Sequence, residues 1–95
     1  MNTFDKIYNE HKDNLELYVP VVARVHGPTH PVFYEVKNHY DAIVAKLNQD
    51  LKSDLSEDFM QLRKVTDNYD VPSDTCETYE AVYAMLGNLD RAYFE

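Results

Sequence analysis

The sequence predicts an all-α fold, an antiparallel up-down four-helix bundle that forms a single domain over residues 1–95. Apolar residues recur at steps of three and four in four separate segments, which is the spacing of one face of an α-helix. The chain has only two glycines and four prolines, too few turn residues for a sheet built from hairpins. Four amphipathic helices joined by short connections can bury their apolar faces only against a shared centre.

Composition and charge argue against several classes of protein. The 17 acidic and 9 basic residues give a formal net charge of −8, which disfavours nucleic acid and anionic membranes as partners. No apolar run approaches the roughly 20 residues that span a bilayer, so we expect no membrane segment. Cys76 is the only cysteine and cannot form an internal disulfide, and the chain opens without a signal sequence. We therefore expect a cytoplasmic protein.

The first helix is predicted over residues 4–25. Pro20 lies inside it and lacks a backbone donor, so we expect a kink or a restart between Tyr18 and Pro20. The helix must end near Val25 or His26, because residues 27–31 include a glycine and two prolines. Its apolar stripe consists of Phe4, Ile7, Tyr8, His11, Leu15, Tyr18, Val22 and Val25.

The second helix is predicted to begin directly after this turn. Thr29 or His30 would be its N-cap and Pro31 would lie near its first helical position. The apolar stripe that follows consists of Phe33, Val36, Tyr40, Ile43, Val44, Leu47 and Leu51. The polar run over residues 48–58 then indicates a loop.

Two more helices follow, each with a predicted start signal. Asp54 and Glu57 resemble a capping box that opens the third helix, and Ser73 or Asp74 is expected to begin the fourth. Gly87 inside the fourth helix indicates a close approach of another helix. The third stripe is Leu55, Phe59, Leu62, Val65 and Tyr69, and the fourth is Tyr79, Val82, Tyr83, Leu86, Leu89 and Tyr93.

The four histidines are the first candidates for a site. His11 lies on an apolar stripe, where a core residue with a satisfied ring is commoner than a ligand. His26 and His30 are four residues apart, but the prolines around them forbid an unbroken helix, so their spacing alone cannot show that they converge. They are either metal ligands or caps of the two adjoining helices. Glu35 and His39 are four residues apart and could share a metal ion, but they flank the second stripe and are expected on a solvated face instead.

Cys76 is the only candidate nucleophile. It falls in the predicted first turn of the fourth helix, where the helix dipole favours a thiolate. No histidine is adjacent in sequence to serve as a base, so a small buried hydrophobic residue is the favoured interpretation. The acidic residues of the loop are explained by capping and dipole effects, without a metal ion. Because no catalytic motif is present, the sequence does not predict an enzyme.

Two segments resemble a known family. The run YVPVVARVHGPTHPVFYEV, residues 18–36, resembles the VARVHG..HPEL segment of the RIC proteins, the ScdA and YtfE type of di-iron protein for iron-sulfur cluster repair. The run LRKVTDNYDVPSDTCETYEAVYAML, residues 62–86, is similar to that family's T.NY.PP..AC.T..ALY..L segment. The resemblance covers nearly half the chain. It implies a hemerythrin-like bundle and a role in cluster repair.

The resemblance carries over few of the family's iron ligands. His26 matches the histidine of the RVHG motif, which the family uses as a metal ligand. The family's earlier ligand histidine falls near Asp5, and its HxxxE pair falls near Asp50 and Asp54, where no histidine is found. A di-iron centre needs about five to seven protein ligands on facing helices, so a full centre in the monomer is not expected, which leaves a mononuclear site or a site shared between subunits.

The sequence therefore leads to two main hypotheses. In the first, the chain is a short RIC-like protein of iron-sulfur cluster repair or of the iron and oxidative stress response, with at most a partial iron site at His26 and His30. In the second, it is a metal-free helical module that binds a protein partner or a second copy of itself. A third hypothesis, an enzyme with Cys76 as nucleophile, rests on the helix dipole alone.

Overall fold

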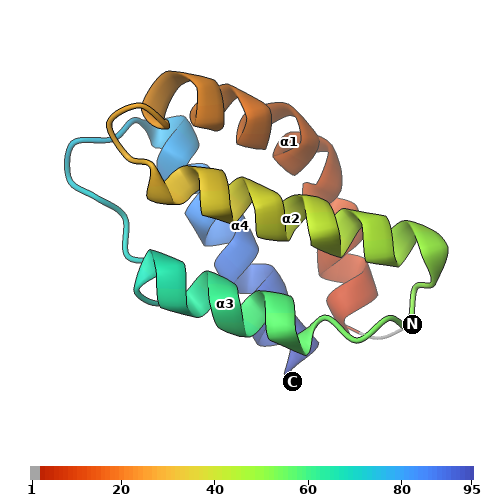
Figure 1. The fold of residues 1–95 in the computed structure, drawn as a ribbon. Helices are drawn as coiled ribbons and strands as arrows, with labels where there is room; N and C mark the ends of the chain where they lie inside the picture. Colours follow the sequence, from red (N-terminus) through yellow and green to blue (C-terminus); the bar gives the residue numbers. More distant parts are fainter. Residues whose placement is uncertain (1–2) are drawn as a thin grey trace.

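A computed structural model describes residues 3–95 and confirms the prediction of an all-α four-helix bundle (Figure 1). The chain reverses its course at each connection between helices. Within residues 3–95, no helix is both long enough and apolar enough to cross a membrane. The helices are α1 (Thr3–His26), α2 (Val32–Gln49), α3 (Ser56–Thr66) and α4 (Glu77–Tyr93).

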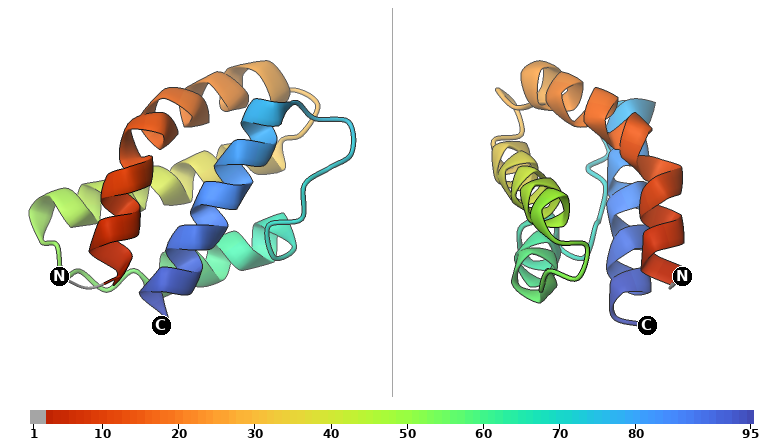
Figure 2. Two further views of the ribbon diagram at one scale, coloured as in Figure 1. Left: turned by 180° about the vertical axis from the view of Figure 1, so that it is seen from behind. Right: turned by 90° about the vertical axis from the view of Figure 1, so that its right-hand side faces the viewer.

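The helices form two layers. Seen edge-on in Figure 2, α1 and α4 lie side by side, and α2 and α3 form the second layer. This arrangement brings the C-terminal end of α1, the turn into α2 and the first turn of α4 to one end of the bundle. The closer likeness to a hemerythrin-type bundle stays a prediction.

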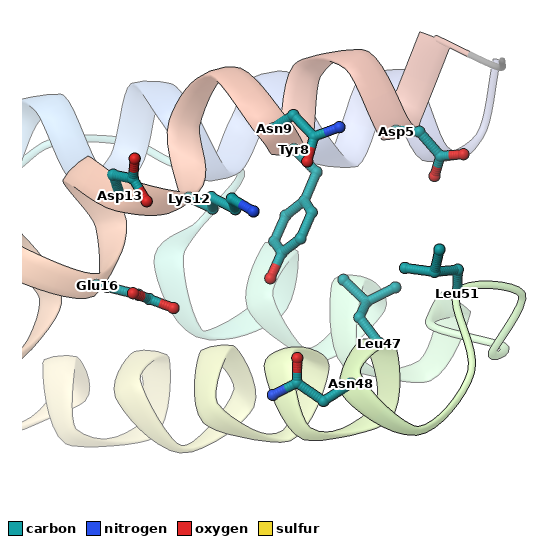
Figure 3. A pocket seen from close by; sticks show the side chains of 9 residues that line it. All are labelled: Asp5, Tyr8, Asn9, Lys12, Asp13, Glu16, Leu47, Asn48 and Leu51. Atoms are coloured by element: carbon teal, nitrogen blue, oxygen red, sulfur yellow. The ribbon is translucent and has the colours of Figure 1, made fainter.

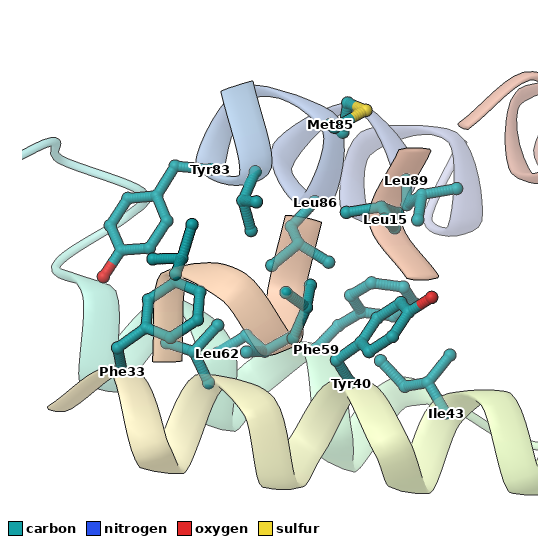
Figure 4. Close-up of a cluster of buried hydrophobic side chains, with 14 of the residues drawn as sticks. Leu15, Phe33, Tyr40, Ile43, Phe59, Leu62, Tyr83, Met85, Leu86 and Leu89 are labelled. Atoms are coloured by element: carbon teal, nitrogen blue, oxygen red, sulfur yellow. The ribbon is translucent and has the colours of Figure 1, made fainter. Parts of the chain in front are cut away.

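The core lies between the two layers and contains most of the predicted stripes (Figure 4). Two predicted members, Val25 and Leu51, are instead 60% and 66% exposed, because they lie at or beyond a helix end. The largest fully buried side chains are Tyr79, Tyr83, Phe33 and Phe59. Four aromatic rings in so short a chain supply much of the apolar area that holds the layers together.

The helix boundaries agree with the predictions for α1 and differ for the others. α1 runs through Pro20 without a restart and bends along its course (Figure 2). α2 begins at Val32, with Pro31 as N-cap. At α3, Asp54 accepts hydrogen bonds from the backbone and hydroxyl of Ser56, so it forms a local turn and not a reciprocal capping box.

The start of α4 was predicted too early. Cys76 is the N-cap, and the helix begins at Glu77. Asp74 does not cap α4, because its carboxylate pairs with His30 at 3.1 Å. Gly87 does not mark a close helix approach either, since a Cβ atom there would meet the ring of Tyr69 at 3.6 Å, an ordinary van der Waals distance.

A left-handed exit from α3 is held by Asp90. Asp67, Asn68 and Tyr69 all have positive φ, which is unfavourable for residues with a side chain. The Tyr69 amide donates to Thr66 Oγ1 at 2.8 Å, and the Tyr69 hydroxyl donates to the buried carboxylate of Asp90 at 2.7 Å. Burial, together with this bond, raises the pKa of Tyr69 far above its usual value.

Arg63 neutralises the same buried carboxylate. Its Nε donates to Asp90 at 2.8 Å and its Nη2 donates to the second oxygen, which gives a two-pronged ion pair between α3 and α4. The guanidinium also lies over the ring of Phe94, 4.7 Å from its centroid. A buried charge that lost this partner would be strongly destabilising, so the ion pair fixes how α3 sits on α4.

A second buried carboxylate, Asp58, connects α3 to α2. His39 Nδ1 lies 3.2 Å from one of its oxygens, and Lys46 Nζ donates to the other at 2.6 Å. The prediction that His39 lies on a solvated face is therefore wrong, because its imidazole packs against the carboxylate of Asp58 on α3. Burial raises the pKa of Asp58, but the bonds from Lys46 and His39 outweigh burial and bring the pKa below its usual value.

We expect Asp58 to make folding stability depend on acid pH. A carboxylate whose pKa is lowered in the folded state stabilises the fold above the unfolded pKa of about 4, and this contribution is lost as the pH falls further. Asp58→Asn should lower the free energy of unfolding by about 1 to 2 kcal/mol at pH 7. Its stability should also fall less than that of the wild type between pH 5 and pH 3.

The measurement is urea unfolding followed by circular dichroism at several pH values. Asp13→Asn, which removes an exposed carboxylate from α1, is the matched control. Equal acid sensitivity in the wild type and Asp58→Asn would show that Asp58 is not the group responsible.

Candidate functional site

The candidate site lies at the end of the bundle where α1 stops and α4 starts. His26 is the last residue of α1 and Cys76 is the N-cap of α4. The Nε2 atom of His26 lies 3.2 Å from the Sγ atom of Cys76, although the residues are 50 positions apart in sequence. Cys76 is exposed, so the favoured prediction of a buried hydrophobic cysteine is wrong. The fold supplies the histidine neighbour that the local sequence lacks.

Gly27 sets the path of the chain directly after His26. Its amide donates to Ala23 O at 3.0 Å and ends α1. A Cβ atom at this position would lie 2.3 Å from Ala23 O and 2.4 Å from the ring of Tyr34. Because the first of these atoms belongs to the backbone, only glycine fits here without a shift of the turn.

The ring of Tyr79 packs against the imidazoles of both His26 and His30. Its ring meets His26 edge-on at 5.5 Å between centroids, and His30 at 5.9 Å. Tyr79 is fully buried, stands 5.1 Å from Phe33 and shares a hydrogen bond of 3.1 Å with the hydroxyl of Tyr83. Burial raises the pKa of Tyr79, so both hydroxyls stay protonated at neutral pH. The positions of the imidazoles are therefore fixed by the core.

His30 completes the group but has its own partner. Its Nε2 lies 3.1 Å from Asp74 Oδ1, and the carboxylate is 71% exposed. The ring centroids of His26 and His30 are 6.4 Å apart. Among residues 3–95, neither ring forms a hydrogen bond to a backbone group at a helix end. The prediction that these two histidines are metal ligands stays a prediction.

Chemically, the arrangement is a thiol within hydrogen-bond reach of an imidazole. This is the pairing that activates a cysteine nucleophile, with the imidazole as proton acceptor. Both groups are also ligands for iron and zinc when they are deprotonated. No sequence motif indicates the pair, because its two residues are 50 positions apart, one at the end of α1 and one at the start of α4.

A resident di-iron centre does not fit these residues. Among residues 3–95, no three or more histidine, cysteine, aspartate or glutamate side chains are grouped so that they could hold a metal ion. Asp5 and His26 lie near opposite ends of α1, about 30 Å apart at the rise of an α-helix. Asp50 and Asp54 accept bonds from Lys52 and Ser56 in the loop before α3. The positions that match the family's ligands therefore do not converge.

The remaining histidine is unrelated to this end of the bundle. His11 is half-buried on α1, and its Nε2 lies 3.5 Å from Asn88 Nδ2 on α4. This agrees with the prediction of a structural role on the inner stripe. Glu35 is exposed, as expected, and His39 contacts Asp58 instead of sharing a site with Glu35.

Comparison with known proteins gives one consistent result. The chain is 28% identical to the iron-sulfur cluster repair protein ScdA of Staphylococcus haemolyticus (strain JCSC1435), over 97% of this chain and 56% of that protein. It is 21% identical to the ScdA of Staphylococcus epidermidis (strain ATCC 35984), over 95% of this chain and 55% of that protein. This chain is similar to the ScdA iron-sulfur cluster repair proteins over nearly its whole length. The family resemblance seen in the sequence is thereby confirmed.

The match to ScdA has clear limits of extent. The chain spans about half the length of the ScdA proteins it matches. The first alignment runs over 125 positions, more than the 95 residues of this chain, so that ScdA carries extra residues inside the matched region. No protein-family profile and no solved structure matches the chain.

We expect the thiol of Cys76 to react faster because of His26. In the folded protein, iodoacetamide should alkylate Cys76 without prior unfolding, since the side chain is exposed. His26→Gln removes the proton acceptor and should slow the reaction about tenfold or more at neutral pH. The rate is followed by intact-protein mass spectrometry.

His30→Gln is the matched control, because it changes the neighbouring imidazole that pairs with Asp74 and not with the thiol. It should leave the rate nearly unchanged. Equal rates for the wild type and His26→Gln would contradict an activating role of His26.

Proposed function

We propose that this chain takes part in the repair of iron-sulfur clusters or in the response to iron or oxidative stress, and that it does so without a di-iron centre of its own. The observation that carries the proposal is its relation to the ScdA repair proteins over 97% of its length. The spread of Asp5, Asp50, Asp54 and His26 over both ends of the bundle supports the second half of the proposal.

The Cys76 and His26 pair is the feature through which such a role would act. Two ligand atoms on one tetrahedral metal ion, one sulfur and one imidazole nitrogen, stand about 3.5 Å apart. His26 Nε2 and Cys76 Sγ are 3.2 Å apart, so a small increase in this distance would let both atoms bind one iron ion of a damaged cluster. In this proposal the iron ion is transferred to the client protein and is not a resident cofactor of this chain. The exposed position of Cys76 leaves its outer side open for ligands from the client protein.

A second candidate function is the metal-free interaction module. It is favoured by exposed apolar side chains beside the same site, because Val25 is 60% exposed and Tyr34 is 46% exposed. These residues flank the turn that carries His26. In this alternative the end of the bundle docks on a protein partner, and the thiol takes no part in the chemistry.

A reactivation assay tests the first proposal. An enzyme whose [4Fe–4S] cluster has been damaged by peroxide is incubated with iron, thiol reductant and this chain, and its recovered activity is measured. We expect the wild type to speed recovery and Cys76→Ser to lose most of that effect, since a hydroxyl is a poor ligand for iron.

The matched control keeps a thiol but moves it away from His26. The double variant Cys76→Ser with Ser73→Cys places the thiol three residues earlier, on the exposed loop before α4. It should behave like Cys76→Ser. Full recovery with Cys76→Ser, together with loss in Val25→Asp, would instead favour the interaction module. No effect of the wild type on recovery would contradict the repair role.

A further inference from the structure

The Cys76 and His26 pair offers only half of the ligands that a tetrahedral metal ion takes. Closed protein sites of this geometry have four ligands, and this chain supplies one sulfur and one imidazole nitrogen, 3.2 Å apart. Within residues 3–95, no third histidine, cysteine, aspartate or glutamate joins them in a metal-binding group. His30 lies near, but its Nε2 faces the carboxylate of Asp74 at 3.1 Å. The other two ligands must therefore come from outside this chain.

Both groups of the pair can be reached from outside the bundle. Cys76 is exposed and His26 is half-buried. They lie where α1 ends and α4 begins, at one end of the molecule, so a second copy can approach them end to end (Figure 1). The ring of Tyr79 packs against the imidazole of His26 from the core. The imidazole is thus held in place before binding, which lowers the entropic cost of binding a metal ion.

Exposed apolar side chains flank the pair and favour contact with another protein surface. Val25, directly before His26, and Tyr34 are both exposed. The ring of Tyr34 lies against Gly27, the residue after His26. Two copies that meet at this end around a twofold axis remove these side chains from water in both chains.

Negative charge opposes contact between two copies at this end. The chain has a formal net charge of −8, and the exposed residues Asp74, Glu77 and Glu80 lie within four positions of Cys76. Two copies that approach each other here repel. A divalent cation held between the two pairs supplies positive charge at the point of closest approach. Contact between copies at this end therefore depends on a metal ion.

We propose that two copies of this chain share one divalent metal ion, which is bound tetrahedrally by Cys76 and His26 of each copy. Two sulfur and two imidazole nitrogen ligands suit zinc and ferrous iron. A twofold axis through the ion gives both copies the same contacts. This inference rests on the proposed function, because it completes the same metal-binding pair. It names a second copy as the source of the outer ligands until a client protein takes its place.

The groove between α1 and α2 is unsuited to this ion (Figure 3). It lies along the first half of α1, away from His26. Its lining includes the carboxylates of Asp5, Asp13 and Glu16, and none of the lining residues is a cysteine or a histidine. Carboxylates suit magnesium and calcium better than they suit zinc or ferrous iron. Asp13 therefore serves as a control position.

Sedimentation velocity during a titration with Co(II) tests the proposal, because Co(II) adopts the tetrahedral geometry of zinc and absorbs visible light. Under anaerobic conditions with a phosphine reductant, we expect a monomer without metal and a dimer that is complete at one Co(II) per two chains. The spectrum should show thiolate-to-metal charge transfer and the intense visible bands of a tetrahedral ion. An equal amount of dimer without metal would overturn the proposal.

Variants test whether the pair supplies the ligands. Cys76→Ser and His26→Gln each remove two of the four ligands of a shared site and should abolish both the dimer and the cobalt bands. His30→Gln and Asp13→Asn are the matched controls and should behave like the wild type, since neither touches the pair. Circular dichroism checks that each variant keeps its helices. A metal-dependent dimer that persists in Cys76→Ser and in His26→Gln would overturn the shared site.

The same titration separates this inference from the proposed function. A monomer that binds one Co(II) per chain, and loses it in Cys76→Ser, would overturn the shared site and leave the iron-binding role of the pair intact. A metal-dependent dimer that has no effect on cluster reactivation would support the shared site and contradict the repair role. Zn(II) and Fe(II) are titrated in the same way, and the ion that forms the dimer at the lower concentration is the one that the site prefers.

Discussion

The carboxylate of Asp90 is the constraint on which the rest of the structure depends. It is buried on α4, and both Arg63 of α3 and Tyr69 of the segment after α3 donate to it. The bond to Tyr69 anchors the last of three successive residues with a left-handed backbone, and over these residues the chain turns away from α3. The turn directs the following loop along the bundle to the first turn of α4. The connection that brings Cys76 to His26 is thus anchored where it leaves α3 by the bonds to Asp90.

This geometry explains how a bundle that is similar in sequence to the ScdA proteins differs from a di-iron protein. A di-iron centre needs ligands that project from several helices to one point in the core. Here the core is filled by aliphatic and aromatic side chains, and the matching positions are spread over both ends of α1 and the loop before α3. What remains for chemistry lies at the surface of one end, where Tyr79 supports two imidazoles beside an exposed thiol.

The apolar spacing was sufficient to predict the four helices and most of the core, but not that α1 continues through Pro20 without a restart. It could not predict the start of α4, because from the sequence Asp74 is a good candidate for a cap, whereas in the fold it pairs with the distant His30 and Cys76 is the N-cap. The same holds for Cys76 and for His39, whose partners lie 50 and 19 residues away. Side chains at helix ends and in loops depend on tertiary contacts, which a pattern of local periodicity does not contain.

The central claim is that this chain builds no di-iron centre and that any iron it holds is bound at Cys76 and His26. The most direct test is the iron content per chain, by elemental analysis, after anaerobic incubation with Fe(II) and desalting. We expect less than one iron ion per chain, and we expect Cys76→Ser to abolish what is retained. Two iron ions per chain that persist in Cys76→Ser would contradict the claim, because the core would then have to supply ligands that this structure does not bring together.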